Sequence, residues 1–356
     1  MVIGPDSVGF GLIGASSIAW RSMVQAIRRQ APEDSVDLIA PAWVVAVCSQ
    51  RESRARSFAE AHKIPHTYTV VEEMLARREI RSVYVSTHPS RQGKMVKAAL
   101  LAGKHVLCET PLALTLDEAD NLCQMAANRG LVLAVNLIFR AQPAVESMRR
   151  LLEDGAIGDL LGARVNNTAM LDPESRGWRL HSPDGGVLLD RTIHDIDILH
   201  YLVRDRVTQV FASSTPRLLN SDRQDAVEEE MLAQVYFAES GITVQLHDSF
   251  NLPHVPATIE IYGSRGTLTV QDWTDMEGYG QLTLYRSRRR QIQPTVEMQP
   301  AIESVRRFLS AIGGDGPPLA TGEDARESLQ VILALHASTR RNHLVRLDAS
   351  QGRSIR

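Results

Sequence analysis

The chain has 356 residues, 44% of them apolar and 23% charged, with a formal net charge of −3 at pH 7. This length suits two globular domains, and the slight negative charge argues against the basic surface that nucleic-acid binding requires. Three cysteines without C-x-x-C spacing argue against a disulfide framework or a zinc site. No apolar run reaches membrane-spanning length and the first residues lack a leader pattern, so we expect a cytoplasmic protein that does not bind membranes.

The first 136 residues alternate short apolar runs with segments of helical periodicity. The apolar runs predict strands at Val8–Ile13, Trp43–Ser49, Ser82–Thr87, His105–Glu109 and Leu131–Asn136. The intervening segments predict helices at Ser17–Gln30, Ser53–His62, Val71–Arg78, Gln92–Ala102 and Leu116–Arg129. Strands that alternate with helices form right-handed βαβ units. We therefore expect residues 1–136 to form an α/β Rossmann domain, a parallel sheet with helices on both faces.

The turn from the first strand into the first helix reads Gly14-Ala15-Ser16-Ser17-Ile18-Ala19. A nucleotide pyrophosphate needs close backbone approach and free N–H groups at a helix N-terminus, and these small side chains allow both. The match to G-x-G-x-x-G/A is imperfect, because Ser16 stands at the second glycine and Ala19 at the third. A tight turn without a ligand is the alternative, but its place in a βαβ unit favours NAD(P) binding. The predicted contacts are Gly14, Ala15, Ser16, Ser17 and Ile18.

The end of the second predicted strand bears on the choice between NAD and NADP. An acidic residue there binds the ribose 2′-hydroxyl of NAD, whereas a basic residue accommodates the 2′-phosphate of NADP. The chain has Ser49-Gln50-Arg51 and then Arg54, and its Glu52 points into the next helix. Ser49 can donate a hydrogen bond and either arginine can pair with phosphate, so NADP(H) is favoured over NAD(H). A solvated helix start is the alternative.

The pattern changes from residue 137, where a bridging helix at Pro143–Asp154 is followed by strand after strand. The predicted strands are Leu161–Met170, Thr208–Ser214, Met231–Phe237, Ile242–Asp248, Thr258–Tyr262, Gly266–Val270 and Gln281–Tyr285. Helices return at Pro300–Ile312 and Glu323–Thr339. We expect residues 137–356 to form an α+β domain, an open antiparallel sheet with helices on one face. This domain would bind the substrate and join copies into a homodimer or homotetramer through the sheet.

Gly185-Gly186 precede a segment that places Asp190, His194 and Asp197 at helical spacings of four and three, so that they share one face. A carboxylate one turn before an imidazole suits proton transfer, because the reference pKa of histidine, about 6.5, lies near working pH. An amphipathic helix with a polar outer face is the alternative. Nothing in the spacing of these residues indicates a metal site.

Together these segments resemble the Gfo/Idh/MocA oxidoreductase family over nearly the whole chain. The resemblance rests on the turn at Gly14, on Gly185 through Asp197, and on further stretches at Ala102–Glu109, Gly155–Gly158 and Ala320–Ala325. It implies an NAD(P)-dependent oxidoreductase that transfers a hydride between nicotinamide and a sugar, polyol or cyclic ketone. In that activity His194 would transfer the substrate proton and Asp190 would orient or polarise.

The chain departs from the family pattern at two places. The family normally has Glu-Lys-Pro after the fourth strand, where this chain has Glu109-Thr110-Pro111, and threonine cannot carry the positive charge of that lysine. After the third strand the family often has Thr-Pro-Asn and then a histidine, where this chain has Thr87-His88-Pro89 and then Gln92. If the redox site has been rebuilt, a catalytic Thr110 and His88 would donate hydrogen bonds, and Thr87, His88 and Glu109 would contact the cofactor. A loop residue facing solvent is the alternative for His88.

The resemblance also implies that Asn136 lies near the nicotinamide and Arg140 near the substrate, with a helix cap and a surface arginine as the alternatives. Trp178 and Arg179 resemble a substrate-side loop, although an ordinary salt bridge is the alternative for Arg179. The retained pair of Asp190 and His194 favours a working redox site. A dinucleotide-binding sensor or partner protein without turnover is a second interpretation, and a hydrolase or lyase that uses bound cofactor transiently is a third.

Overall fold

The computed structural model describes residues 8–29, 41–181, 183–215, 219, 227–275, 277–287 and 289–347. The chain forms two compact units. Unit 1 holds the described residues up to Ile138 together with Ala301–Arg326, and unit 2 holds Phe139–Pro300 and the described residues from Glu327 onward. The sequence assigned everything after residue 136 to one domain, whereas the structure packs residues 301–326 with the first unit.

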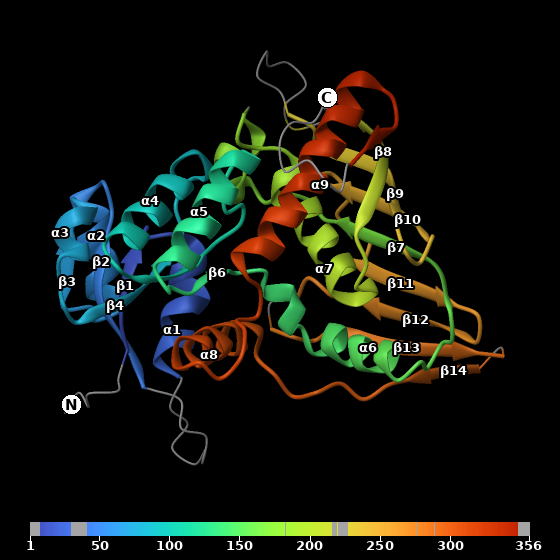
Figure 1. Cartoon of the computed structure of the whole chain (residues 1–356), viewed down its shortest axis with the longest axis horizontal. Coiled ribbons are helices and arrows are strands. Elements are labelled where there is room, and N and C mark those ends of the chain that lie inside the picture. Colours follow the sequence, from blue (N-terminus) through green and yellow to red (C-terminus); the bar gives the residue numbers. More distant parts are fainter. Residues whose placement is uncertain are drawn as a thin grey trace. The chain divides into compact units, whose positions relative to one another are not determined.

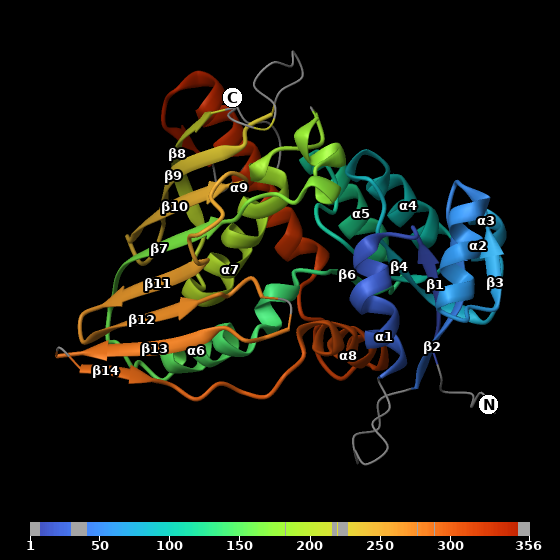
Figure 2. The same cartoon turned by 180° about the vertical axis from the view of Figure 1, so that it is seen from behind.

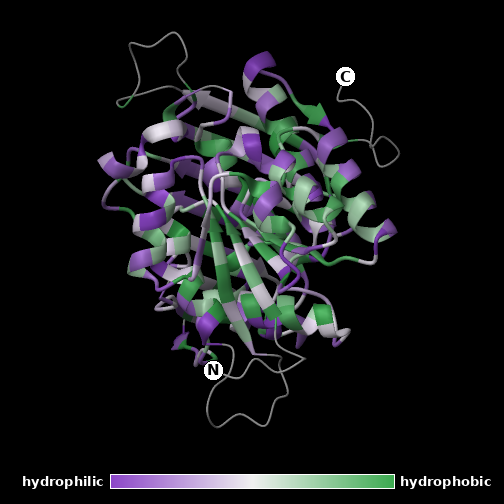
Figure 3. Ribbon diagram, turned by 90° about the vertical axis from the view of Figure 1, so that its left-hand side faces the viewer, coloured by the Kyte–Doolittle hydropathy of each residue, from purple (hydrophilic) through white to green (hydrophobic). Residues whose placement is uncertain are grey.

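Unit 1 is built on a six-stranded sheet in which every neighbouring pair of strands is parallel, in the order β3-β2-β1-β4-β5-β6. The strands are β1 (Val8–Ile13), β2 (Ala42–Cys48), β3 (His66–Tyr68), β4 (Ile80–Val85), β5 (His105–Cys108) and β6 (Leu133–Val135). Figure 3 shows the apolar strands between helices whose hydrophilic sides face outward. Strands covered on both faces need continuous apolar runs, and this is why the sequence predicted them. The Rossmann architecture is confirmed.

The helices of unit 1 follow the strands in the expected alternation. They are η1, a π-helix (Ala19–Met23), α1 (Val24–Arg28), α2 (Glu52–Ala61), α3 (Val71–Leu75), α4 (Pro89–Leu101), α5 (Leu116–Asn128) and α8 (Pro300–Gly313). Phe308 of α8 packs on Phe10 of β1, with ring centroids 6.0 Å apart, in a core that also buries Val305. Each such apolar side chain contributes roughly 1.5–3 kcal/mol when buried. This core explains why α8 belongs to unit 1.

Unit 2 is built on a nine-stranded sheet in the order β14-β13-β12-β11-β7-β10-β9-β8-β15. Its strands are β7 (Leu160–Thr168), β8 (Val207–Thr215), β9 (Glu230–Phe237), β10 (Thr243–Ser249), β11 (Thr258–Gly263), β12 (Gly266–Gln271), β13 (Gln281–Arg286), β14 (Arg289–Ile292) and β15 (Val345–Arg346). The sheet is mostly antiparallel, but β7 and β10 pair in parallel. The sheet is therefore mixed, because these two strands come from distant parts of the chain and not from one hairpin.

The helices of unit 2 gather on one face of this sheet, as expected, with α6 (Pro143–Glu153) and α7 (Ile193–Val203) lying against it (Figures 1 and 2). Shorter helical turns are η2 (Ile138–Ala141), η3 (Pro173–Ser175), η4 (Gly177–Leu180) and η5, a π-helix (Leu188–Thr192). The last helix, α9 (Gly322–Arg341), reaches β8 through Ser338, whose Oγ accepts a hydrogen bond from the N–H of Ala212 at 3.0 Å. In the part of the chain that the structure describes, no helix is long and apolar enough to cross a membrane.

Candidate active site

The turn after β1 has the geometry that a dinucleotide needs. Gly14 has φ +108°, and a Cβ at this position would lie 2.2 Å from the carbonyl oxygen of Ser86, so only glycine fits. Ser16 Oγ accepts a hydrogen bond from the N–H of Ala19 at 3.1 Å and donates one to Ser86 Oγ at 2.8 Å. The N–H groups of the first helical turn have no partner within the helix and favour an anion. The small residues present here fit the pyrophosphate of a dinucleotide.

The four predicted selectivity residues lie at the end of β2 and the start of α2. Gln50, Arg51 and Arg54 are exposed, and Ser49 is half-buried. Arg54 Nε donates to the carbonyl oxygen of Ala15 at 2.9 Å, which fixes this arginine beside the glycine turn. The four side chains that were predicted from the sequence to favour a 2′-phosphate are therefore grouped where β2 ends and α2 begins.

A chain of hydrogen bonds joins three strand ends of unit 1 to α8. Glu109 Oε1 accepts hydrogen bonds from Tyr84 Oη and from Asn136 Nδ2, the latter at 2.7 Å. Asn136 Oδ1 in turn accepts from Ser304 Oγ at 2.7 Å. Burial raises the pKa of the Glu109 carboxyl, although the two hydrogen bonds partly counter the rise. Two predicted cofactor residues, Glu109 and Asn136, are therefore hydrogen-bonded directly to each other.

Gln92 connects the loop after β4 to the turn that carries Thr110. Its Oε1 accepts from the N–H of Thr87 at 3.2 Å, and its Nε2 donates to the carbonyl oxygens of Glu109 and Pro111. Gln92 is 1% exposed, so its amide group lies inside the protein. The two carbonyl groups flanking Thr110 are thereby fixed by one amide.

His88 and Thr110 differ in their surroundings. Thr110 is half-buried and precedes a cis peptide bond to Pro111. His88 is exposed at the start of α4, with its Nδ1 2.9 Å from Ser90 Oγ. This exposed position agrees with the alternative that His88 is a residue facing solvent. A contact between His88 and nicotinamide stays a prediction.

The helical segment of unit 2 departs from the regular spacing expected of it. Asp190 lies in the π-helix η5, and the α-helix begins only at Ile193. A π-turn holds an extra residue, so the angular spacing of Asp190, His194 and Asp197 is not that of a regular α-helix, and their common face stays a prediction. Asp190 Oδ1 accepts a hydrogen bond from Arg179 Nε at 2.6 Å. This is the ordinary salt bridge that the sequence left open for Arg179.

His194 packs against an aromatic ring that is itself held by a second one. The Phe139 ring meets the imidazole edge to face, with centroids 5.0 Å apart, and Trp273 meets Phe139 in the same way at 5.2 Å. His194 keeps part of its surface exposed, but its Nδ1 atom is shielded from solvent. Desolvation lowers the pKa of His194 to about 4, against a smaller opposing effect of the Asp190 charge. The imidazole is therefore neutral at physiological pH and able to accept a proton.

Two predicted substrate residues have close partners within unit 2. Arg140 is 6% exposed and forms a buried ion pair with Asp197, with Nε 3.0 and 3.1 Å from the two carboxylate oxygens. The guanidinium of Arg179 stacks over the ring of Trp178 at 4.7 Å. A direct substrate contact by Arg140, Trp178 or Arg179 stays a prediction. Among the described residues, no group of three or more His, Cys, Asp or Glu side chains could hold a metal ion.

Known proteins match both halves of the chain. The model of an oxidoreductase family with an NAD-binding Rossmann fold matches residues 8–137, and that of the GFO/IDH/MocA C-terminal domain matches residues 145–269. Over 328 residues the chain is 34% identical to the 1,5-anhydro-D-fructose reductase of Ensifer adhaerens, an alignment covering 92% of this chain and 94% of that enzyme. The chain belongs to the Gfo/Idh/MocA oxidoreductase family.

More distant members share the same fold. The myo-inositol 2-dehydrogenase of Thermotoga maritima is 24% identical over 326 residues, which cover 88% of this chain and 94% of that enzyme. The solved structure of levoglucosan dehydrogenase with NADH and L-sorbose has a TM-score of 0.85 at 22% identity, covering 96% of this chain and 99% of that one. As a member of this family, the chain is an oxidoreductase with an NAD-binding Rossmann domain that acts on a small molecule.

Several residues of the hydrogen-bond network at Glu109 and of the aromatic contacts at His194 were not predicted from the sequence. Tyr84 reads as one apolar strand residue among others, and Ser304 lies 168 positions from the asparagine it contacts. Phe139 and Trp273 come from distant segments of unit 2 and meet only in the folded chain. No local pattern identifies such contacts, because they depend on which segments the tertiary fold brings together.

Proposed function

We propose that the chain transfers a hydride between nicotinamide and a sugar, polyol or cyclic ketone, with His194 carrying the substrate proton. The observation that supports this best is a neutral, largely enclosed imidazole within reach of the Asp190 charge. The named activities of the relatives, on anhydrofructose and myo-inositol, support the substrate class.

The chain's own residues would divide the work as follows. The nicotinamide supplies or accepts the hydride when it is bound. Burial of Nδ1 leaves Nε2 as the His194 atom that exchanges a proton with the reacting hydroxyl or carbonyl. Asp190 favours the charged imidazolium as it forms, and Arg179 holds Asp190 in place. Thr110 would donate a hydrogen bond to the reacting oxygen, held by the fixed carbonyl groups on either side.

A substrate panel tests this function. Purified protein is mixed with NADPH or NADH, and with NADP⁺ or NAD⁺, against sugars, inositols and cyclic ketones while the nicotinamide absorbance is followed. Turnover with one of these compounds supports the proposal. Tight dinucleotide binding without any absorbance change supports the sensor interpretation, which the missing family lysine at Thr110 favours. Cleavage or elimination without net change in the cofactor supports a hydrolase or lyase.

Substitution of Thr110 tests whether the site has been rebuilt. We expect Thr110→Lys to lower turnover by about tenfold or more, because a long charged side chain would displace the hydroxyl from a half-buried position. Thr110→Ser keeps the hydroxyl and is the matched control. Steady-state kinetics with the best substrate of the panel measure both. A rise in turnover for Thr110→Lys would mean that the site has not been rebuilt around Thr110 and still works better with the lysine of the family pattern.

We further propose that the cofactor is NADP(H). Arg51 and Arg54 are both exposed at the start of α2, and Arg54 is held beside the glycine turn, so a 2′-phosphate bound there would find positive charge. Arg51→Ala should raise the Kd for NADPH about tenfold and change the Kd for NADH little. Arg56→Ala is the control, because Arg56 lies on α2, which Arg51 directly precedes, but pairs with Glu52. Equal effects of Arg51→Ala on both Kd values would contradict the preference.

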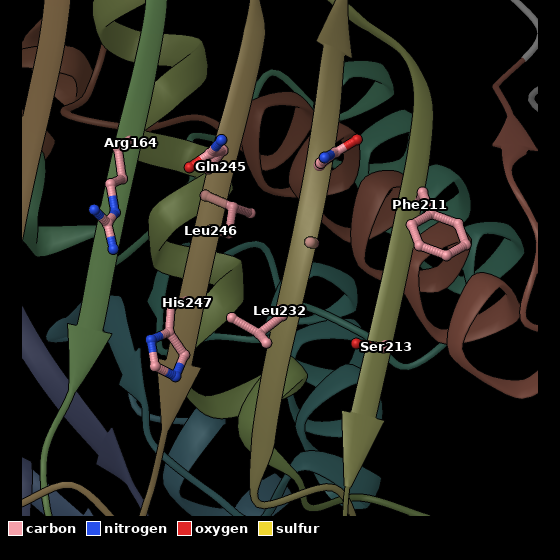
Figure 4. Close-up of a pocket in the computed structure, with 9 residues that line it drawn as sticks. Arg164, Phe211, Ser213, Leu232, Gln245, Leu246 and His247 are labelled. Atoms are coloured by element: carbon pink, nitrogen blue, oxygen red, sulfur yellow. The ribbon is translucent and has the colours of Figure 1, made fainter.

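We also propose that copies associate through the uncovered face of the unit 2 sheet, as a homodimer or homotetramer. Figure 4 shows this face, with Phe211, Leu232 and His247 projecting from adjacent strands around a depression of about 240 Å³. Leu232 is 51% exposed. Leu232→Lys should convert the oligomer to monomers in analytical ultracentrifugation, whereas Leu101→Lys, equally exposed on α4, should not. A wild-type monomer would exclude the proposal. Location in the cytoplasm stays a prediction.

A further inference from the structure

Two carboxyl groups meet in the interior of unit 2, between α7 and β10. Asp195 and Asp248 are both 0% exposed, and the two carboxyl groups lie close enough to interact electrostatically. Asp195 Oδ1 also accepts from Asn167 Nδ2 at 2.7 Å, and Asp248 Oδ2 accepts from Thr192 Oγ1. The remaining oxygens, Asp195 Oδ2 and Asp248 Oδ1, meet no N–H or O–H donor of any other described residue.

A hydrogen bond between two carboxyl groups requires a proton on one of them. An ionised carboxylate only accepts, so two ionised groups would repel each other in this buried site. The charge of Arg191 acts on both carboxyl groups, but its side chain donates to the carbonyl oxygens of Ser249 and Asn167, at 2.5 and 3.4 Å. Its single positive charge balances one carboxylate, and a shared proton neutralises the other.

We propose that Asp195 and Asp248 hold one proton between them, and that the resulting O–H···O hydrogen bond ties the π-turn carrying Asp190 to strand β10. Thr192 is the last residue of that turn and donates directly to Asp248. Asp195 follows His194 in α7. The two aspartates are therefore positioning residues for Asp190 and His194, and only this consequence rests on the proposed function.

The charges around the pair fix the sign of its pH dependence. Arg191 acts on it from η5, where the Asp190 charge acts on Arg191 in turn, and His247 acts on it from β10, while Asn167 of β7 and Thr192 are neutral. Burial is the largest effect and raises the pKa of both carboxyl groups above the ordinary value of 3.8. The folded protein therefore keeps a proton that the unfolded chain releases. The pair contributes most to stability below the unfolded pKa and loses this contribution as pH rises through its folded value.

Asp248→Asn tests the shared proton with almost no change in shape. The asparagine Nδ2 can donate to the Asp195 carboxylate and its Oδ1 can still accept from Thr192, so no proton is needed. Near neutral pH, one retained proton makes the unfolding equilibrium constant rise about tenfold per pH unit. This increment should be present in wild type and absent in Asp248→Asn, measured by urea unfolding at several pH values. Asp205→Asn is the control, because N–H groups lower the pKa of Asp205 and leave no retained proton.

A direct measurement keeps the proposal independent of how the variants fold. The infrared carbonyl band of a protonated carboxylic acid, or the carboxyl carbon resonance of labelled aspartate, should appear at neutral pH in wild type. It should vanish in Asp248→Asn. A wild-type spectrum without a protonated carboxyl group, or an unchanged pH slope in the variant, would overturn the proposal. These readouts need no substrate, so they stand even where the proposed hydride transfer fails.

The activity of two Asp248 variants tests whether the carboxyl pair positions Asp190 and His194. Asp248→Asn should retain turnover and its pH profile, whereas Asp248→Leu, which loses the hydrogen bonds, should lower kcat with little change in cofactor Kd. Equal activity of the two variants would show that the pair does not position Asp190.

Discussion

His194→Ala is expected to lower turnover by about 10²–10⁴-fold while the Kd for the dinucleotide stays unchanged, because the variant removes the proton carrier and leaves unit 1 intact. Asp190→Ala should lower turnover as well, since its charge favours the protonated imidazole. Steady-state kinetics measure the first quantity and calorimetric titration with NADPH the second. Full activity in both variants would contradict the assignment of His194 and Asp190 to proton transfer.

The pH dependence of His194 provides a second test of the same assignment. Its pKa is lowered to about 4 by desolvation, so its neutral form is favoured in the folded state. In the direction of substrate oxidation, activity should lose its proton acceptor only as pH falls through about 4. The stability contribution of the neutral ring is complete above the ordinary pKa of 6.5 and is lost as pH falls from there toward about 4. The His194→Ala variant should lack this loss.

A direct titration separates these effects from those of other groups. The imidazole resonances of His194, assigned by their absence in His194→Ala, should show no protonation near pH 6 in wild type. Phe139→Ala should raise the pKa toward its ordinary value, because removing the aromatic ring admits water to the imidazole. An ordinary pKa in wild type would contradict the enclosed site that the structure describes.

The strands of unit 1 were predictable because burial on both faces requires uninterrupted apolar runs. The prediction of Val8–Ile13 coincides with β1, and the others fall within a few residues of the observed strands. The strand β3 was missed because His66–Tyr68 has only three residues and no apolar run. In unit 2, alternation predicted seven of the nine strands, missed the short β14 and β15, and could not reveal that β7 and β10 are parallel. Strand direction depends on the path of the chain and not on local composition.

The candidate site was less predictable, for two physical reasons. A π-turn and an α-turn share nearly the same apolar pattern over five residues, so Asp190 was given a regular helical position that η5 does not provide. The partners of charged residues are also set by tertiary contacts. Arg179 could be assigned to a substrate or to a salt bridge from sequence, and only the fold brings Asp190 within 2.6 Å. Buried charges need such partners, so the same two roles, substrate binding or a structural ion pair, have to be distinguished for Arg140.

Asp197→Ala is expected to destabilise unit 2 by about 3–5 kcal/mol, because it leaves the buried guanidinium of Arg140 without its counter-ion. The side chains of Arg140 and Asp197 are 7% and 2% exposed, so solvent cannot replace the lost carboxylate. Urea unfolding followed by circular dichroism measures the loss. The exposed pair of Arg56 and Glu52 is the control, and Arg56→Ala should change stability by at most about 0.5 kcal/mol.

The double variant Arg140→Met with Asp197→Leu decides whether the pair is structural or serves the substrate. Replacing both charges by apolar side chains removes the unpaired ion, so most of the stability lost in Asp197→Ala should return. If the restored variant also keeps the KM of wild type, Arg140 acts by holding α7 and does not contact the substrate. If stability returns while KM rises tenfold or more, about 1.4 kcal/mol, the guanidinium binds substrate and the predicted contact holds. A double variant as unstable as Asp197→Ala would instead show that the loss comes from altered packing and not from an unpaired charge.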